Sequence, residues 1–230
     1  MTLPSPAPKA WIAEFVGTFA LVFVGTGAIV VDSVSGGAIR HLGISLAFGA
    51  VVGLMIAIFG RVSGAHLNPA VTVALASAGR FRASGAAGYI AAQLLGALAA
   101  SALLRFLFPA SETLGATLPS GHLSGAFVAE VAATALLVLT ILGVTNTWGE
   151  SSGLPAIAIG SAVALVAGPV SGASLNPARS IGPAVVGGEF DHLWLYLLAP
   201  LCGALLAVPL CATTCGKACC TRTATVSKSN

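Results

Sequence analysis

The sequence predicts an all-α membrane protein in which six transmembrane helices and two re-entrant half-helices form an inverted repeat. Three observations lead to this fold class: a composition suited to a lipid bilayer, uncharged stretches long enough to cross one, and an Asn-Pro-Ala segment that occurs twice. Together they predict two related halves around a central pore.

The composition indicates which solvent surrounds the chain. Hydrophobic residues make up 57% of the 230 residues and charged residues only 7%, with a mean hydropathy of +0.97. A soluble domain carries about 25% charged residues, so this chain belongs in a bilayer. Its net charge of +3 is too small and dispersed to suggest a nucleic-acid partner. The sequence has no Ser-His-Asp order, phosphate loop or metal-ligand spacing of histidines, so we expect no catalysis, cofactor or metal site.

Six stretches are apolar enough to be spanning helices, since a core of ~30 Å needs about 20 residues. We expect these helices at about 9–31, 41–61, 84–107, 124–144, 154–169 and 192–213. They form one channel domain over 1–230, with repeats at about 9–107 and 124–213 and a cytoplasmic tail at 214–230. Three helices per repeat make the second copy enter the membrane from the opposite side.

The distribution of Lys and Arg predicts the orientation of the chain. Only Arg40 and Arg105 fall in loops on one side, whereas the other side carries Lys9, Arg61, Arg80, Arg82, Lys217, Arg222 and Lys228. We therefore expect a multi-pass protein of the cell membrane with both termini in the cytoplasm. The first apolar run lacks a cleavage-site pattern, so we expect it to be retained as a helix.

Residues 63–72 (Ser-Gly-Ala-His-Leu-Asn-Pro-Ala-Val-Thr) return as 171–180 (Ser-Gly-Ala-Ser-Leu-Asn-Pro-Ala-Arg-Ser), 108 positions later. Asn suits a helix N-cap and Pro the first helical turn, so each copy should start a helix, with motif residues Asn68, Pro69 and Ala70, and Asn176, Pro177 and Ala178. At 1.5 Å per residue, a helix over 69–77 spans about 14 Å, roughly half the membrane core. Both are predicted to be half-helices.

Two half-helices that enter from opposite faces point their N-termini at each other, and each N-terminus carries roughly +0.5 charge. This arrangement repels cations, while the asparagine amides donate hydrogen bonds to a neutral solute. The residues before each cap should run extended and present a ladder of carbonyl oxygens to the pore: Gly64, Ala65 and His66, and Gly172, Ala173 and Ser174.

Five motifs in order resemble the aquaporin, or major intrinsic protein, family over nearly the whole chain. They are Ala-Glu-Phe-Val-Gly-Thr at 13–18, Leu-Ala-Phe-Gly at 46–49, the segment 63–72, Gly-Arg-Phe at 79–81 and Asn-Pro-Ala-Arg-Ser at 176–180. The resemblance implies a homotetramer with one conducting pore per subunit. Its partners would be water, small neutral solutes and the lipid bilayer.

The resemblance also implies a selectivity filter made of Phe48, Ala164, Ala173 and Arg179. Strict water channels of the family typically have His at the fifth-helix position, where the spacing gives Ala164, so we expect a wide, half-apolar constriction. Ser180 stands where glycerol facilitators usually have Asp. The combination is closest to the nodulin-like subgroup, which passes glycerol, boric acid, silicic acid or arsenous acid.

Two alternatives to this function remain. One is a strict water-selective channel whose filter is misaligned by one helical step. The other is a coupled secondary transporter, since inverted repeats with broken helices also occur there. Coupling normally needs ionisable groups at the substrate site, and the centre here offers two neutral asparagines, so passive flux is favoured.

Two acidic residues occupy equivalent points of the first helix in each repeat: Glu14 and Glu130, 116 positions apart. An intramembrane carboxyl is a functional candidate, such as a proton relay. The family resemblance instead implies that both lie behind the pore and bind the motif loops, and we favour this supporting role.

Two further segments receive simpler interpretations. Residues 106–123 join the repeats and are predicted to be a linker. Cys211, Cys215, Cys219 and Cys220 could bind a thiophilic metal or trivalent arsenic, but free thiols at the end of the last helix are favoured because no supporting residues are visible.

Overall fold

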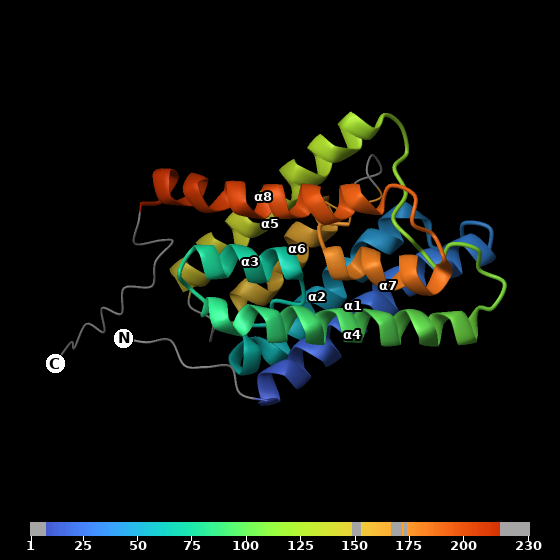
Figure 1. The fold of residues 1–230 in the computed structure, drawn as a ribbon, viewed down its shortest axis with the longest axis horizontal. Helices are drawn as coiled ribbons and strands as arrows, with labels where there is room; N and C mark the ends of the chain where they lie inside the picture. The colour runs from blue at the N-terminus through green and yellow to red at the C-terminus, as the bar shows by residue number, and fades with distance from the viewer. Residues whose placement is uncertain (1–7, 149–152, 167–171, 173, 217–230) are drawn as a thin grey trace.

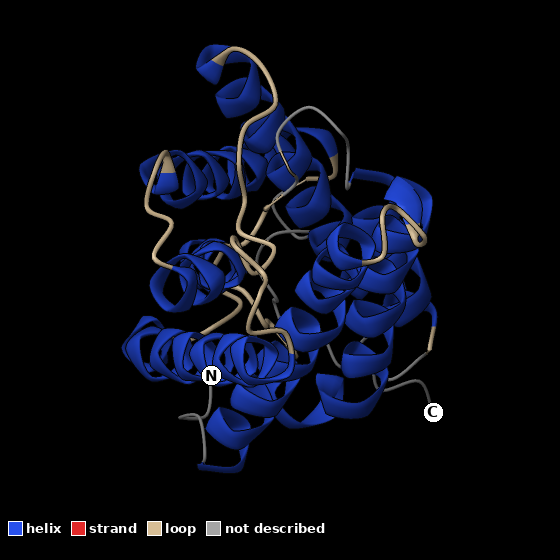
Figure 2. Cartoon of the chain, turned by 90° about the vertical axis from the view of Figure 1, so that its right-hand side faces the viewer, coloured by secondary structure: helices blue, strands red, loops and turns tan. Residues whose placement is uncertain are grey.

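The computed structural model describes residues 8–148, 153–166, 172 and 174–216, and all regular structure within them is helical (Figures 1 and 2). Its eight helices are α1 (Pro8–Val34), α2 (Arg40–Ser63), α3 (Pro69–Ser77), α4 (Ala83–Leu107), α5 (Leu123–Trp148), α6 (Leu154–Val166), α7 (Pro177–Gly187) and α8 (Leu193–Thr214). The six helices predicted to span the membrane all start within one residue of the predicted position.

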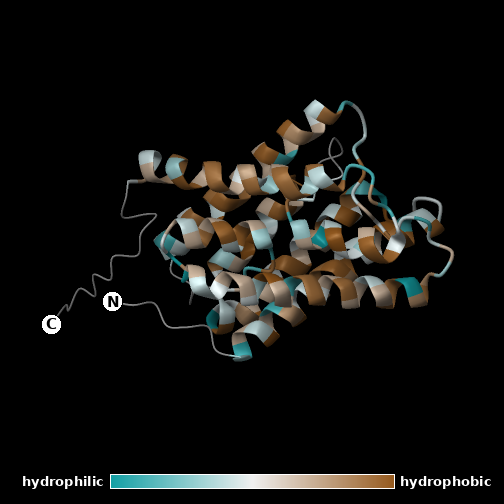
Figure 3. Cartoon of the chain, in the orientation of Figure 1, coloured by the Kyte–Doolittle hydropathy of each residue, from teal (hydrophilic) through white to brown (hydrophobic). Residues whose placement is uncertain are grey.

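Five of the helices in the described part are long and apolar enough to cross a membrane: α1, α2, α4, α5 and α8. Hydrophobic residues cover most of their length, while hydrophilic residues gather toward the two ends of the bundle (Figure 3). The sixth, α6, is apolar but has 13 residues, or about 20 Å at 1.5 Å per residue. The last residues of its predicted span, 167–169, lie outside the described residues.

The first helix of each half packs against the other two membrane helices of its own half in the same way. α1 packs against α2 and α4, and α5 packs in the same way against α6 and α8. Glycines permit the close approach: Gly96 of α4 lies against the backbone of Phe15 in α1, and Gly203 of α8 lies against the backbone of Val131 in α5. Such small residues are the usual means of helix association in lipid.

The short helices α3 and α7 lie end to end across the middle of the bundle (Figure 1). α3 packs against α4 and α8, and α7 packs against α8 and α4, so each is held by the last long helix of both halves. They have 9 and 11 residues, and α3 has the bounds 69–77 that the sequence predicts. The described residues just before them, 65–68 and 174–176, are buried within the protein, as a membrane requires of irregular backbone.

Candidate functional site

Each motif asparagine caps its own short helix. Asn68 has an extended backbone with φ −157°, and its Oδ1 accepts a hydrogen bond from Ala70 N at 2.8 Å. Asn176 is likewise extended, with φ −148°, and its Oδ1 accepts from Ala178 N at 3.0 Å and Arg179 N at 3.4 Å. Proline follows each asparagine in the first turn, where its missing N–H leaves no bond unmade. The amide planes are therefore fixed by the helices that they cap.

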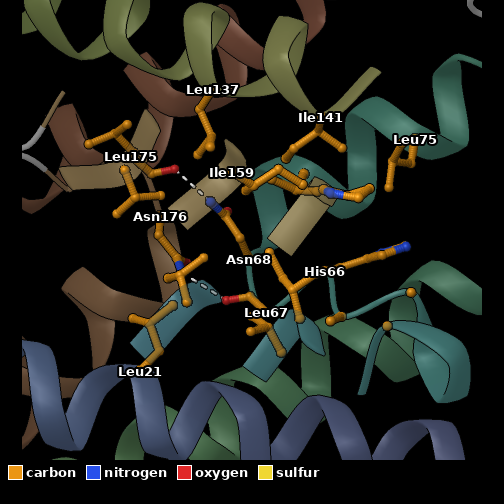
Figure 4. A pocket seen from close by; sticks show the side chains of 18 of the residues that line it. Leu21, His66, Leu67, Asn68, Leu75, Leu137, Ile141, Ile159, Leu175 and Asn176 are labelled. Carbon is orange, nitrogen blue, oxygen red and sulfur yellow. Dashed lines mark hydrogen bonds between the residues drawn. The ribbon is translucent and has the colours of Figure 1, made fainter. Parts of the chain in front are cut away.

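The amide nitrogens of the two asparagines reach across the centre to the opposite segment. Asn68 Nδ2 donates to Leu175 O at 2.7 Å, and Asn176 Nδ2 donates to Leu67 O at 2.8 Å (Figure 4). These reciprocal bonds join the two helix starts, and the sequence does not predict them. Each amide nitrogen carries two hydrogens, so one hydrogen of each remains for a molecule in the cavity.

The sequence predicts that the segments before the caps are extended. In the structure, their described residues are instead partly in the left-handed conformation. The φ angles of Gly64, Ala65 and Leu67 are +86°, +47° and +52°, and those of Gly172 and Leu175 are +75° and +54°. Ala173 lies outside the described residues. The turn conformation brings successive N–H groups together in a concave anion site. A carboxylate binds in each of the two sites, which explains why the segments are not extended.

Glu14 binds the first of these segments from behind and is fully buried. Its Oε1 accepts from His66 N at 2.9 Å and Ser63 Oγ at 2.7 Å, and its Oε2 accepts from Leu67 N and Gln93 Nε2, both at 2.7 Å. These bonds fix the carbonyl that receives the Asn176 amide.

Glu130, also fully buried, repeats this arrangement in the second half. Its two carboxylate oxygens accept from Ser174 N and Leu175 N, each at 2.8 Å. Leu175 is the residue whose carbonyl receives the Asn68 amide, so both carboxylates support the crossed bonds rather than facing the cavity.

Arg179 follows the second motif and is 1% exposed. Its Nη1 donates to Gly115 O at 3.0 Å and Thr117 Oγ1 at 3.1 Å, and its guanidinium carbon lies 5.3 Å from the centroid of the Phe48 ring. Both acceptors belong to the segment 106–123, which the sequence predicts to be a linker, so this segment holds the arginine. No pattern in the sequence marked Gly115 or Thr117 for this role.

A chain of hydroxyl groups connects the arginine to the asparagine segment. Thr117 Oγ1 lies 2.6 Å from Ser180 Oγ, which lies 2.5 Å from Ser174 Oγ. Ser174 Oγ in turn donates to Asn176 O at 3.0 Å. The loop between the halves thus contacts Arg179 directly and is linked through Ser180 to Ser174, which precedes the second motif.

A cavity runs through the centre between these elements. Its polar lining includes Asn68, Asn176, Arg179, His66 and Ser174, and its apolar lining includes Leu21, Phe48, Val52, Leu137, Ile159 and Val163. Figure 4 shows Leu21, Leu137 and Ile159 around the two asparagines. The cavity therefore has hydrogen-bond donors on one part of its wall and hydrocarbon on another.

Three of the predicted filter positions can be located. Phe48 and Arg179 line the cavity, but Ala164 does not. Ala164 packs instead against Gly49 in an outer groove between α2 and α6, and the residue before it, Val163, lines the cavity. The residue that lines the cavity thus lies one position before the one obtained by counting back from Arg179, and that count crosses residues 167–171 and 173, which lie outside the described part of the chain. The fourth position, Ala173, is among the residues not described.

The predicted ladder residues Gly64, Ala65, His66 and Ser174 also line the cavity. Of the cysteines considered as a metal or arsenic site, Cys211 is buried and Cys215 is exposed, while Cys219 and Cys220 lie outside the described residues. In the part of the chain that the structure describes, no three His, Cys, Asp or Glu residues are grouped to hold a metal.

The family model described as Major intrinsic protein matches residues 4–210. The chain belongs to the major intrinsic protein family. It is 40% identical to Aquaporin NIP1-1 of Zea mays over 209 residues, which are 89% of this chain and 74% of that protein. It is 42% identical to Nodulin-26 of Glycine max over 204 residues, 87% of this chain and 75% of that protein.

Among solved structures, the X-ray structure of the aquaglyceroporin from Plasmodium falciparum matches with a TM-score of 0.82 and 28% identity, covering 90% of this chain and 96% of that one. This major intrinsic protein is therefore a passive membrane channel for water and small neutral solutes. The expectation that it is not an enzyme is confirmed by its family, whose members are channels.

We expect Glu14→Gln to lower both the unfolding temperature in detergent and the water permeability of proteoliposomes. The NH₂ group of the glutamine would face N–H or O–H groups that now donate hydrogen bonds to Glu14. An unsatisfied buried donor costs about 1–3 kcal/mol. Glu112→Gln, at an exposed position, is the matched control. A wild-type flux that varies with pH and loses this dependence in Glu14→Gln would instead support a proton relay.

Thr117→Val should lower water permeability and the thermal stability of the channel. It removes one bond to the Arg179 guanidinium, and hydrogen bonds to charged groups contribute about 1.5–3 kcal/mol. The control is Thr140→Val, because the Thr140 hydroxyl donates only to Leu136 O in its own helix among the bonds found. Equal permeability of the two variants would contradict a supporting role for Thr117.

Proposed function

We propose that the cavity between the two asparagine caps is the conducting pathway and that Phe48, Val163 and Arg179 form its constriction, with Ala173 as the fourth wall. We further propose that it passes glycerol, boric acid, silicic acid and arsenous acid as well as water. The observation that carries this proposal is the two-sided lining: polar groups that include Asn68, Asn176 and Arg179 on one part of the wall, and hydrocarbon side chains on another.

A small hydroxylated solute fits such a lining because its two kinds of surface can be satisfied at once. Its oxygens give up hydrogen bonds to water and accept new ones from the guanidinium and from the asparagine amide hydrogens that the crossed bonds do not use. Its less polar face contacts Leu21, Leu137 and Ile159. Binding pockets commonly combine a few placed polar groups with apolar walls in this way.

Val163 changes the expected width of the constriction but not its chemistry. Valine is larger than the alanine that the spacing predicted, so the aperture is narrower than two alanines would make it. It still lacks the second hydrogen-bonding group that His supplies in strict water channels, which favours a constriction that admits carbon-bearing solutes. The strict water channel is the alternative that this residue argues against.

Ion exclusion follows from the electrostatics of the centre. The N-termini of α3 and α7 meet there, each with roughly +0.5 charge, and Arg179 adds a full positive charge beside them. The carboxylates of Glu14 and Glu130 bind backbone N–H groups of the motif segments, so neither serves as a coupling site at the solute. We therefore favour passive flux over coupled transport.

The placement in the cell is proposed on separate grounds. The outer surface carries exposed apolar residues on several helices, such as Ile12, Leu54, Val128 and Ile157, and the basic residues favour cytoplasmic termini in the cell membrane. The repeated contact pattern supports one channel domain with repeats at about 9–107 and 124–213, followed by a tail at 214–230. Family resemblance supports a homotetramer.

The solute range can be measured with the purified protein in liposomes by stopped-flow light scattering. We expect water, glycerol and boric acid to enter faster than in protein-free liposomes, with no ionic current across planar bilayers. Entry of water alone would favour the strict water channel. Glycerol uptake that requires a sodium or proton gradient would favour the coupled transporter.

We expect Val163→His to lower glycerol permeability about tenfold while water still passes, because a single added group in a tight site changes discrimination by about 10-fold or more. Val163→Leu narrows the same place without a polar group, so it separates the effect of size from that of hydrogen bonding. If Val163→His conducts glycerol as well as the wild type does, Val163 does not lie at the constriction.

A further inference from the structure

α1 lies directly behind the aromatic residue of the cavity wall at Gly25. A Cβ atom added to Gly25 would lie 2.6 Å from Cζ of Phe48 and still nearer to Cδ1 and Cε1. Carbon atoms in ordinary contact are ~3.5–4.0 Å apart, so the edge of the ring occupies the space that any other residue at position 25 would fill.

The ring is confined on its other side as well. The Arg179 guanidinium carbon lies 5.3 Å from the ring centroid, and Arg179 is in turn bonded to Gly115 and Thr117. Phe48 lines the cavity. A ring pushed away from the backbone of α1 therefore moves by roughly 1 Å toward the lumen and the arginine, if an ordinary carbon contact is to be restored.

We propose that Gly25 is a positioning residue for solute selection: the absence of its side chain lets the Phe48 ring sit back against α1 and so sets the width of the constriction. This inference rests on the proposed function, in which Phe48 borders the narrowest part of the pathway. It assigns to α1 a share in a constriction that the sequence placed on other segments.

Two other glycines of the same helix show why this position is different. An added Cβ at Gly17 would meet the tip of the Leu67 side chain, and one at Gly27 would meet only Leu104 Cδ2 at 3.3 Å. Leu104 is not among the residues that line the cavity, and a leucine tip can shift by a rotation that a packed aromatic ring cannot make. Gly27 is therefore the matched control for Gly25.

The experiment compares Gly25→Ala, Phe48→Leu, the double variant Gly25→Ala/Phe48→Leu and the control Gly27→Ala in proteoliposomes, with glycerol and water permeability measured per reconstituted channel. We expect Gly25→Ala to lower glycerol permeability about tenfold and the glycerol-to-water ratio with it, as one extra methyl group can do in a tight site. The double variant should regain the ratio of Phe48→Leu, because the smaller side chain removes the overlap. Gly27→Ala should keep the wild-type ratio.

An unchanged glycerol-to-water ratio in folded Gly25→Ala, or a double variant whose ratio stays below that of Phe48→Leu, would overturn the inference. If Gly25→Ala yields no monodisperse protein, the comparison between the double variant and Phe48→Leu decides alone. If the wild type passes only water, the proposed solute range fails, and the inference is then tested by water permeability: a loss in Gly25→Ala that the double variant restores supports it, and no loss overturns it.

Discussion

The crossed hydrogen bonds between Asn68 and Leu175 and between Asn176 and Leu67 are the contacts on which the rest of the structure depends. A membrane interior tolerates interrupted helices only if the freed backbone groups find partners, and here each half supplies partners for the other. The two helix starts are thereby held tip to tip, with the positive ends of α3 and α7 at the centre. Neither half can build this arrangement alone.

Two buried carboxylates make the crossed bonds possible. Glu14 and Glu130 each bind the N–H groups of two successive residues, and the second residue in each pair is the one whose carbonyl accepts the opposite amide. A charge in a membrane is costly unless it is paired or hydrogen-bonded. These carboxylates accept several such bonds, which is why a segment with left-handed residues such as Leu67 and Leu175 can be rigid.

The two halves share this scaffold but differ in what they present to the cavity. Val71 stands in the first motif where Arg179 stands in the second, and both line the cavity. The loop between the halves binds Arg179, whose guanidinium donates hydrogen bonds to Gly115 and Thr117. Selection is therefore concentrated beside one half-helix, where an arginine, an aromatic ring and the backbone of α1 meet.

The sequence by itself determined the solvent, the helix starts, the half-helix at 69–77 and the residues that cap it, because hydropathy and capping are local properties that the order of residues records. It also identified Glu14 and Glu130, since a charged residue repeated in apolar sequence is conspicuous. The tertiary structure alone decided that Val163 rather than Ala164 faces the cavity, that Gly115 and Thr117 hold Arg179, and that Gly25 receives Phe48. Those features depend on helix rotation and on contacts between distant segments, and one residue of error in rotation exchanges the cavity wall for the outer surface.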